Sequence, residues 1–329
     1  MVNTIYFGGG TPGILPDEIL ETIFDSLRKN FSISEQAEIT LETNPDDVTF
    51  EKARFWKEMG VNRLSIGIQS FSDEYLKWMN RAHNATTAEA CIRIAQKSGF
   101  DNLTIDLIYG LPNLSIQNWK KDIERIINLG VPHVSSYCLT VEPKTVLAHN
   151  IEKGKDKPVD DQAAAEQFKT LQEVLDKNGY HQYEVSNFSL PAMESKHNSA
   201  YWKGTPYVGL GPSAHGFTGS SRYSNIANNA RYCAAIEQNE LPQEVELLSK
   251  ENRFNEWIMT RLRMTEGISL TQAKAEFDVN LQEDYQDVIN RRISQGHLTL
   301  MEGRIRLTRE GLFFADGIAA EFFILDHED

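Results

Sequence analysis

The chain has 329 residues with a net charge of −14 at neutral pH, and 40% of its residues are hydrophobic. A chain of this length can bury a large core. The chain is acidic and has no long run of Lys or Arg, so its charge does not indicate a surface that binds nucleic acid. No apolar stretch approaches the ~20 residues of a membrane span. We therefore expect neither a nucleic-acid partner nor a membrane-spanning segment.

Three cysteines, Cys91, Cys138 and Cys233, stand far apart in the chain. They form neither a metal-ligand pair nor a disulfide framework. We expect Cys91 and Cys138 to pack as small hydrophobic side chains. This usage is typical of a reducing compartment and favours a cytoplasmic location.

The first 141 residues alternate between strand and helix patterns. Apolar runs typical of strands occupy 4–7, 38–42, 63–68, 103–109 and 134–141. Amphipathic segments typical of helices occupy 16–30, 49–59, 73–80, 87–98 and 115–129. The repetition predicts an α/β fold with a parallel sheet, either open or closed into a partial or full barrel. In both arrangements ligands gather at the carboxyl ends of the strands.

The middle of the chain is less regular. A polar stretch, 142–161, interrupts the alternation, and a helix is expected at 162–178. The segment 183–224 is rich in Gly, Pro, Ser and aromatic residues. We expect it to be irregular and, because it is too long for a plain connection, either functional or wrapped over a site. A further helix is expected near 228–238, and Pro242 marks a boundary.

The residues after Pro242 follow another pattern. Helices are expected at 250–263, 270–277 and 281–295, then a hairpin of 297–301 and 304–307, and a final helix from Thr308. Helices followed by a two-stranded wing are typical of winged-helix domains. Such domains often bind DNA, but the acidic composition of this one argues against that role. We divide the chain into 1–145, 146–242 and 243–329.

The ends of the predicted strands carry the residues suited to bind a ligand. Gly8, Gly9 and Gly10 end the first strand, where they expose backbone N–H and C=O groups. Polar side chains on or after the next strands are Glu42, Gln69, Arg81 and Asp106. Either carboxylate could instead cap a helix or pair with Arg81. Together, the glycine turn, two carboxylates, an amide and a guanidinium suit an amino acid joined to a nucleoside.

A second motif, His-Asn-Ser-Ala-Tyr-Trp, lies at 197–202. Histidine ligates haem iron in several protein classes, and aromatic rings can stack on a porphyrin. The alternative is a loop anchored by aromatic side chains. His215 fits a structural loop histidine better than a ligand. Neither a P-loop nor a nucleophile-elbow motif occurs in the sequence.

The motifs at the strand ends resemble the radical S-adenosylmethionine (SAM) superfamily, and within it the oxygen-independent coproporphyrinogen III oxidase-like group. The matching motifs, in the family's order and spacing, are Tyr-Phe-Gly-Gly-Gly-Thr-Pro, Leu-Glu-Thr-Asn-Pro, Ser-Ile-Gly-Ile-Gln-Ser-Phe, Asn-Arg and Ile-Asp-Leu-Ile-Tyr-Gly-Leu-Pro. The resemblance covers essentially the whole chain. It implies a partial (β/α)6 barrel followed by a winged-helix-like α+β domain.

The resemblance also implies roles for single residues. Gly9, Gly10 and Thr11 match the positions that hold the methionine end of SAM. The side chains that match the lining of the SAM pocket are Glu42, Gln69, Arg81 and Asp106, and Thr140 matches a weaker contact.

Two branches of the group differ in their chemistry. Coproporphyrinogen dehydrogenases decarboxylate two propionates of a porphyrinogen in SAM-dependent haem biosynthesis. The HemW-type branch resembles haem chaperones and carries His-Asn-x-x-Tyr-Trp, which is intact in this chain. That match implies haem contact by His197, Asn198, Tyr201 and Trp202. We therefore expect a HemW-like chaperone that binds haem and SAM and delivers haem to other proteins; the alternative is a coproporphyrinogen III oxidase.

The family's Cys-x-x-x-Cys-x-x-Cys loop, which holds a [4Fe–4S] cluster, and its first barrel strand are expected upstream of Met1. The chain is therefore expected to be N-terminally truncated, to bind no cluster and not to cleave SAM reductively. Loss of a strand would expose a sheet edge, which invites pairing with a second chain. We expect reduced stability and a possible homodimer.

Overall fold

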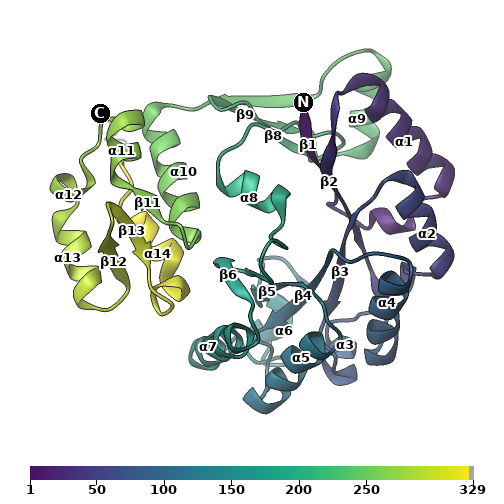
Figure 1. Cartoon of the computed structure of the whole chain (residues 1–329), viewed down its shortest axis with the longest axis horizontal. Coiled ribbons are helices and arrows are strands. Elements are labelled where there is room, and N and C mark those ends of the chain that lie inside the picture. The colour runs from purple at the N-terminus through teal and green to yellow at the C-terminus, as the bar shows by residue number, and fades with distance from the viewer. Residues whose placement is uncertain (326–329) are drawn as a thin grey trace. The chain divides into compact units, whose positions relative to one another are not determined.

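The structure is a computed structural model that describes residues 1–325. It divides into two compact units, Met1–His197 and Asn198–Asp329, and each is described by itself (Figure 1). The last four residues of the expected C-terminal region, 326–329, lie outside the described residues. The sequence-based division at 145/146 and 242/243 stays a prediction.

The first unit is built on a seven-stranded sheet in the order β1-β2-β3-β4-β5-β7-β6. Its first five strands are parallel: β1 (Val2–Phe7), β2 (Ile33–Thr43), β3 (Arg63–Gln69), β4 (Leu103–Tyr109) and β5 (His133–Cys138). Two short antiparallel strands, β6 (His181–Glu184) and β7 (Asn187–Ser189), extend it beyond β5. Parallel pairing brings the carboxyl ends of β1–β5 to one edge, as the alternating pattern predicts.

Helices cover the outer face of this curved sheet (Figure 1). They are α1 (Asp17–Asn30), α2 (Phe50–Met59), α3 (Asp73–Trp78), α4 (Ala85–Lys97), α5 (Ile116–Asn128) and α7 (Asp161–Lys177), with 3-10 turns at Pro12–Ile14 and Pro45–Asp47. Local chemistry sets their ends. Thr49 caps α2 by accepting the Lys52 N–H, and the C-cap that follows Met59 is Gly60, whose φ of +102° favours glycine.

Three details of the middle region differ from the sequence-based expectation. The polar stretch 142–161 contains a helix, α6 (Val146–Glu152), which Thr145 caps. Segment 183–224 is only partly irregular: β7, α8 (Lys196–Trp202), β8 (His215–Phe217) and β9 (Ser221–Asn225) alternate in it with turns and loops. The strand expected at 134–141 ends at Cys138, because its ladder with β4 stops where Gly110 turns the chain.

Up to residue 325, the second unit holds two three-stranded sheets. The first has the order β10-β9-β8, with β10 at Gln243–Leu247, and the second has the order β11-β13-β12. The strands of the second sheet are β11 (Ile268–Ser269), β12 (Leu298–Met301) and β13 (Arg304–Leu307). Its helices are α9 (Asn229–Glu237), α10 (Lys250–Arg263), α11 (Leu270–Phe277), α12 (Leu281–Asp284), α13 (Gln286–Ser294) and α14 (Ala315–Ala320), with a 3-10 turn at Gly311–Phe314.

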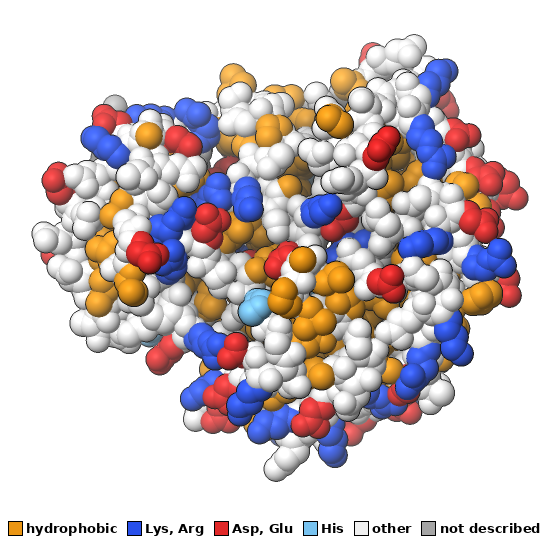
Figure 2. Space-filling model, viewed as in Figure 1, with side chains coloured by type: hydrophobic (Ala, Val, Ile, Leu, Met, Phe, Trp, Pro, Cys, Tyr) orange, Lys and Arg blue, Asp and Glu red, His pale blue; other side chains and the backbone are white. Residues whose placement is uncertain are grey.

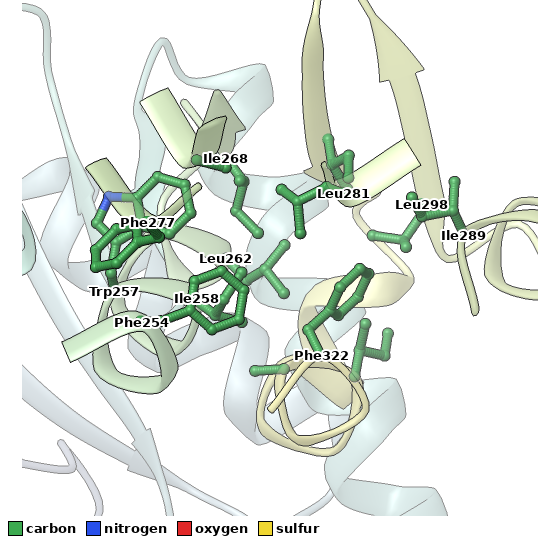
Figure 3. Packing of buried hydrophobic residues seen from close by; sticks show 14 residues of the cluster. Phe254, Trp257, Ile258, Leu262, Ile268, Phe277, Leu281, Ile289, Leu298 and Phe322 are labelled. Atoms are coloured by element: carbon green, nitrogen blue, oxygen red, sulfur yellow. The ribbon is translucent and has the colours of Figure 1, made fainter. Parts of the chain in front are cut away.

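The helices after residue 250 pack around one apolar cluster (Figure 3). Phe254 and Leu262 of α10 are fully buried in it with Phe322. Helices and a small antiparallel sheet form the expected winged-helix-like domain. The single helix expected at 281–295 is wrong, since Tyr285 leaves helical geometry and separates α12 from α13. The final helix begins later than Thr308, whose side chain instead accepts the Gly311 N–H.

The surface is charged and mixed. Figure 2 shows acidic and basic side chains interspersed over the face in view. Among residues 1–325, no helix is both long and apolar enough to span a bilayer.

Candidate functional site

The glycine turn follows β1 directly, and its three glycines serve different purposes. A Cβ on Gly8 would lie 2.7 Å from the Tyr6 ring and 2.8 Å from Glu42 Oε1, so Gly8 allows close packing. Gly9 has a φ of +81°, which favours glycine. A Cβ on Gly9 or Gly10 would meet no atom within 4 Å. The backbone of these two residues therefore faces open space that a ligand can occupy.

Glu42, near the end of β2, lies beside this turn. Its Oε2 accepts the Gly9 N–H at 3.2 Å, and its Oε1 accepts the Tyr6 hydroxyl at 2.7 Å. Burial, reinforced by the Glu42 charge, holds the pKa of Tyr6 well above its usual value. Tyr6 therefore stays protonated and donates to Glu42 at physiological pH.

Arg81 lies against the ends of β2 and β3. Its Nη2 donates to Asn44 Oδ1 at 2.7 Å and to the Gly67 carbonyl at 2.9 Å. The Asn44 amide in turn donates to Thr11 Oγ1 at 3.2 Å. Within residues 1–325, Arg81 forms no salt bridge to a carboxylate, and its buried Nε has no hydrogen-bond partner. Arg81 therefore makes no close ion pair with Glu42 or Asp106 in this part of the chain, although its positive charge opposes the rise in the pKa of Asp106.

Gln69 ends β3 in a left-handed conformation, with a φ of +70°. A non-glycine residue in this region is uncommon, and such strain concentrates at functional sites. A Cβ on Gly67 would lie 3.0 Å from Gln69 Nε2 and 3.5 Å from Arg81 Nη2. The glycine therefore makes room for both predicted pocket side chains.

Asp106 lies on β4, in register with Ser135 of β5. Burial raises the pKa of Asp106 to about 7, and the Glu42 charge adds to the rise, while a hydrogen bond with Ser135 opposes it. Near neutral pH this carboxyl exists in both protonation states and can donate or accept a hydrogen bond. Thr140 differs: it is exposed, two residues beyond β5, and its hydroxyl donates to the Cys138 carbonyl at 3.4 Å.

His197, at the start of α8, belongs to the same unit as the glycine turn. Its ring stacks on Tyr6 with centroids 4.8 Å apart and planes at 24°. Its Nδ1 lies 3.0 Å from the Thr4 hydroxyl. Burial lowers the pKa of His197, so the imidazole is neutral at pH 7 despite the opposing charge of Glu38.

Glu38 of β2 holds the beginning of α8. This buried carboxylate accepts the backbone N–H groups of His197 at 2.9 Å and Lys196 at 3.1 Å, and the Ser195 hydroxyl at 3.3 Å. A carboxylate from another element therefore acts as the cap of this helix. The position of His197 is fixed by its backbone as well as by its ring.

The other haem-motif residues belong to the second unit. Tyr201 is exposed, and the centroids of the Tyr201 and Tyr207 rings lie 4.3 Å apart. The Arg263 guanidinium lies over the Trp202 ring, 5.3 Å from its centroid, and the Trp202 indole N–H is buried without a partner among the described residues. Asn198 directly follows His197 in α8.

Comparison with known proteins gives matches over nearly the whole chain. Residues 1–126 match the Radical SAM superfamily model, and residues 248–314 match the HemN C-terminal domain model. The chain is 33% identical to "Heme chaperone HemW" of Lactococcus lactis, over 99% of this chain and 86% of that protein. This chain belongs to the HemW family of the radical SAM superfamily. The HemW protein of Bacillus subtilis is 32% identical over 98% and 85% of the two chains.

A solved structure confirms the fold of this HemW-family chain. It is the coproporphyrinogen III oxidase HemN from Escherichia coli, described as a radical SAM enzyme. The TM-score is 0.83 over 98% of this chain and 78% of HemN, at 21% sequence identity. The expected fold class, a partial radical SAM barrel followed by a C-terminal domain, is thereby confirmed.

The superfamily implies SAM and a [4Fe–4S] cluster, and the two groups fit the present residues differently. The open glycine turn, two carboxylates and Arg81 suit SAM. Cys91 is buried in α4, where burial raises the pKa of its thiol to about 12, and Cys233 is exposed in α9. Within residues 1–325, no group of three His, Cys, Asp or Glu side chains is arranged to hold a metal ion. The described residues therefore do not fit the cluster.

Sequence reasoning missed three residues of this site, Thr4, Tyr6 and Glu38. Thr4 and Tyr6 share one face of β1 with Gly8, and period-2 alternation is the signal that could have found them. Glu38 is a charged residue in a buried strand, which is itself a sign of a specific partner. His215 is an exposed residue of β8, where a loop histidine was expected.

Proposed function

We propose that this HemW-family chain binds haem and SAM and delivers haem to acceptor proteins. The observation that supports the proposal is the set of contacts around His197. Contacts with Glu38, Thr4 and Tyr6 fix the orientation of this neutral histidine. Histidines that bind metals are oriented by partner groups in the same way. The relatives named heme chaperones support the same interpretation.

In this proposal His197 ligates the haem iron or orients the porphyrin, and Asn198 contacts the same ligand. Tyr201 and Trp202 provide aromatic faces for the macrocycle, since porphyrins bind through large apolar surfaces. Haem and haem-accepting proteins are then the partners. The cysteine usage favours a cytoplasmic location. Pairing of a second copy along β1, an edge strand, stays a prediction.

The SAM site in this proposal is the pocket at the carboxyl ends of the strands. Gly9, Gly10 and Thr11 take the methionine end, and Arg81 binds its carboxylate. The side chains that complete the pocket are Glu42, Gln69 and Asp106, with Thr140 at its margin. SAM supplies a reactive sulfonium when bound. This chain's own residues bind and orient it, and Asp106 holds or releases a proton near neutral pH.

Hemin titration followed in the Soret region tests the proposal. The wild-type chain should give a saturable response, and His197→Ala should bind at least about tenfold more weakly, a loss of ~1.4 kcal/mol. His181→Ala is the matched control, because His181 is an exposed strand residue of the same unit. Equal hemin affinity in wild type and His197→Ala would overturn the role of His197.

Coproporphyrinogen III oxidase remains the competing activity. It shares the fold, but its reaction depends on a cluster that the described residues do not fit. A form of the chain preceded by the family's Cys-x-x-x-Cys-x-x-Cys loop separates the two activities, and with coproporphyrinogen III it should give no decarboxylated product. Multiple turnovers would overturn the chaperone proposal.

A further inference from the structure

Tyr6 lies between the two proposed ligand sites of the first unit. One face of its ring stacks on His197, with centroids 4.8 Å apart, and its hydroxyl donates to Glu42 Oε1 at 2.7 Å. The second oxygen of Glu42 accepts the Gly9 N–H of the glycine turn. Two short contacts therefore connect the haem-motif histidine with the wall of the SAM-type pocket.

Each contact restricts the position of the Tyr6 ring. The phenol is protonated at working pH, so its hydroxyl must have an acceptor when it is buried. Glu42 is the acceptor that the structure provides. A shift in the position of the Glu42 carboxylate therefore shifts the Tyr6 ring, against which His197 packs.

Glu42 can receive a further donor without releasing Tyr6. A carboxylate has about four acceptor positions. The Tyr6 hydroxyl and the Gly9 N–H occupy one on each oxygen. A cationic or hydroxyl donor of a ligand on the open side of Gly9 and Gly10 can use another. Such a ligand would fix the carboxylate, and with it the Tyr6 ring.

We propose that Tyr6 couples the two sites, so that SAM bound at the glycine turn strengthens the binding of haem at His197. The inference rests on the proposed function, whose haem site it takes as given. Rigidifying a shared element lowers the entropy that the second ligand must lose, which produces positive coupling without a large structural change. By linkage, haem strengthens SAM binding by the same factor.

The experiment measures the hemin dissociation constant of the full chain with and without saturating SAM. For each protein we take the ratio of the constant without SAM to the constant with SAM, and we compare these ratios between proteins. A substitution that changes hemin affinity equally in both conditions leaves the ratio unchanged. Wild type should bind hemin about fivefold or more tightly with SAM present, the lower end of usual coupling. Tyr6→Phe keeps the ring and loses the donor to Glu42, and its ratio should be near one.

The matched control is Tyr180→Phe. Tyr180 is buried, whereas Tyr6 is half-buried, and it too donates its hydroxyl, to the Val131 carbonyl; in the part of the chain described it contacts neither Glu42 nor His197. Its ratio should equal that of wild type.

Three outcomes would overturn the inference: a wild-type ratio of one, weaker hemin binding in the presence of SAM, or an equal ratio in Tyr6→Phe and wild type. Each leaves the hemin response itself in place. Failure of the proposed function is distinct, because hemin binding would then be absent or independent of His197.

Discussion

The proposed SAM site at the carboxyl ends of the strands in the first unit and the helical core of the second unit differ in chemistry. Around β1–β4 the structure holds Glu42, Asp106 and Arg81 close to apolar strands, and the pKa of Asp106 departs far from its usual value. The core around Phe254 and Leu262 consists of apolar side chains. Buried polar groups cost stability unless they are satisfied, and they concentrate where a ligand supplies what is missing. The polar side chains at the strand ends therefore suit the proposed binding of a ligand, and the apolar side chains of the helical core stabilise the fold.

The largest expected effect is a loss of stability when a large side chain is removed from the helical core. Phe254→Ala removes a fully buried ring and should lower the free energy of unfolding of this domain by about 3–5 kcal/mol. Urea unfolding followed by tryptophan fluorescence would report it, because Trp257 lies in the same cluster. SAM affinity should be unchanged in the folded variant. A loss below about 1 kcal/mol would show that the core is loosely packed.

A change in the opposite direction, an increase in stability, is expected for Asp106, a half-buried carboxyl of the proposed SAM site. The pKa of Asp106 is raised from 3.8 to about 7 in the folded chain. The folded state therefore retains a proton that the unfolded state loses, and this residue reduces stability as pH rises from about 4 to 7. Asp106→Asn removes the charge and should stabilise the chain at pH 8 by at most about 4 kcal/mol, with no gain at pH 3.5. Thermal melts of both proteins across this range measure the difference. A gain independent of pH would contradict the raised pKa.

A smaller change in stability should distinguish substitutions at Gly8 from substitutions at Gly10. Gly8→Ala places a methyl group 2.7 Å from the Tyr6 ring and should cost about 1–3 kcal/mol through overpacking. Gly10→Ala meets no atom within 4 Å, so its stability should match wild type while SAM binding weakens. Thermal melts and SAM titration of the two variants would check both statements. Equal melting temperatures for Gly8→Ala and wild type would show that the close contacts at Gly8 are absent.

Much of this arrangement was predictable from sequence, because it depends on local patterns. Apolar periodicity and helix-end glycines located β1–β5 and their helices, with β4 at Leu103–Tyr109 as expected. Parallel connection then places Glu42, Gln69 and Asp106 toward one edge of the sheet. The choice between an open sheet and a barrel needed the family resemblance, since periodicity does not report sheet curvature.

The rest depends on contacts between distant segments. Glu38 and His197 are far apart in sequence, and no local pattern predicts that a strand carboxylate caps α8. The two-residue strand β11 exists only because β13 pairs with it. The raised pKa of Asp106 also follows from burial and from Glu42, neither of which is readable from its own segment.

The most direct test of haem binding through His197 is the dissociation constant of hemin for His197→Ala, measured beside wild type and His181→Ala. We predict a rise of about tenfold or more for His197→Ala alone. Identical constants for all three proteins would contradict this, because the histidine held by Glu38, Thr4 and Tyr6 would then have no part in haem binding.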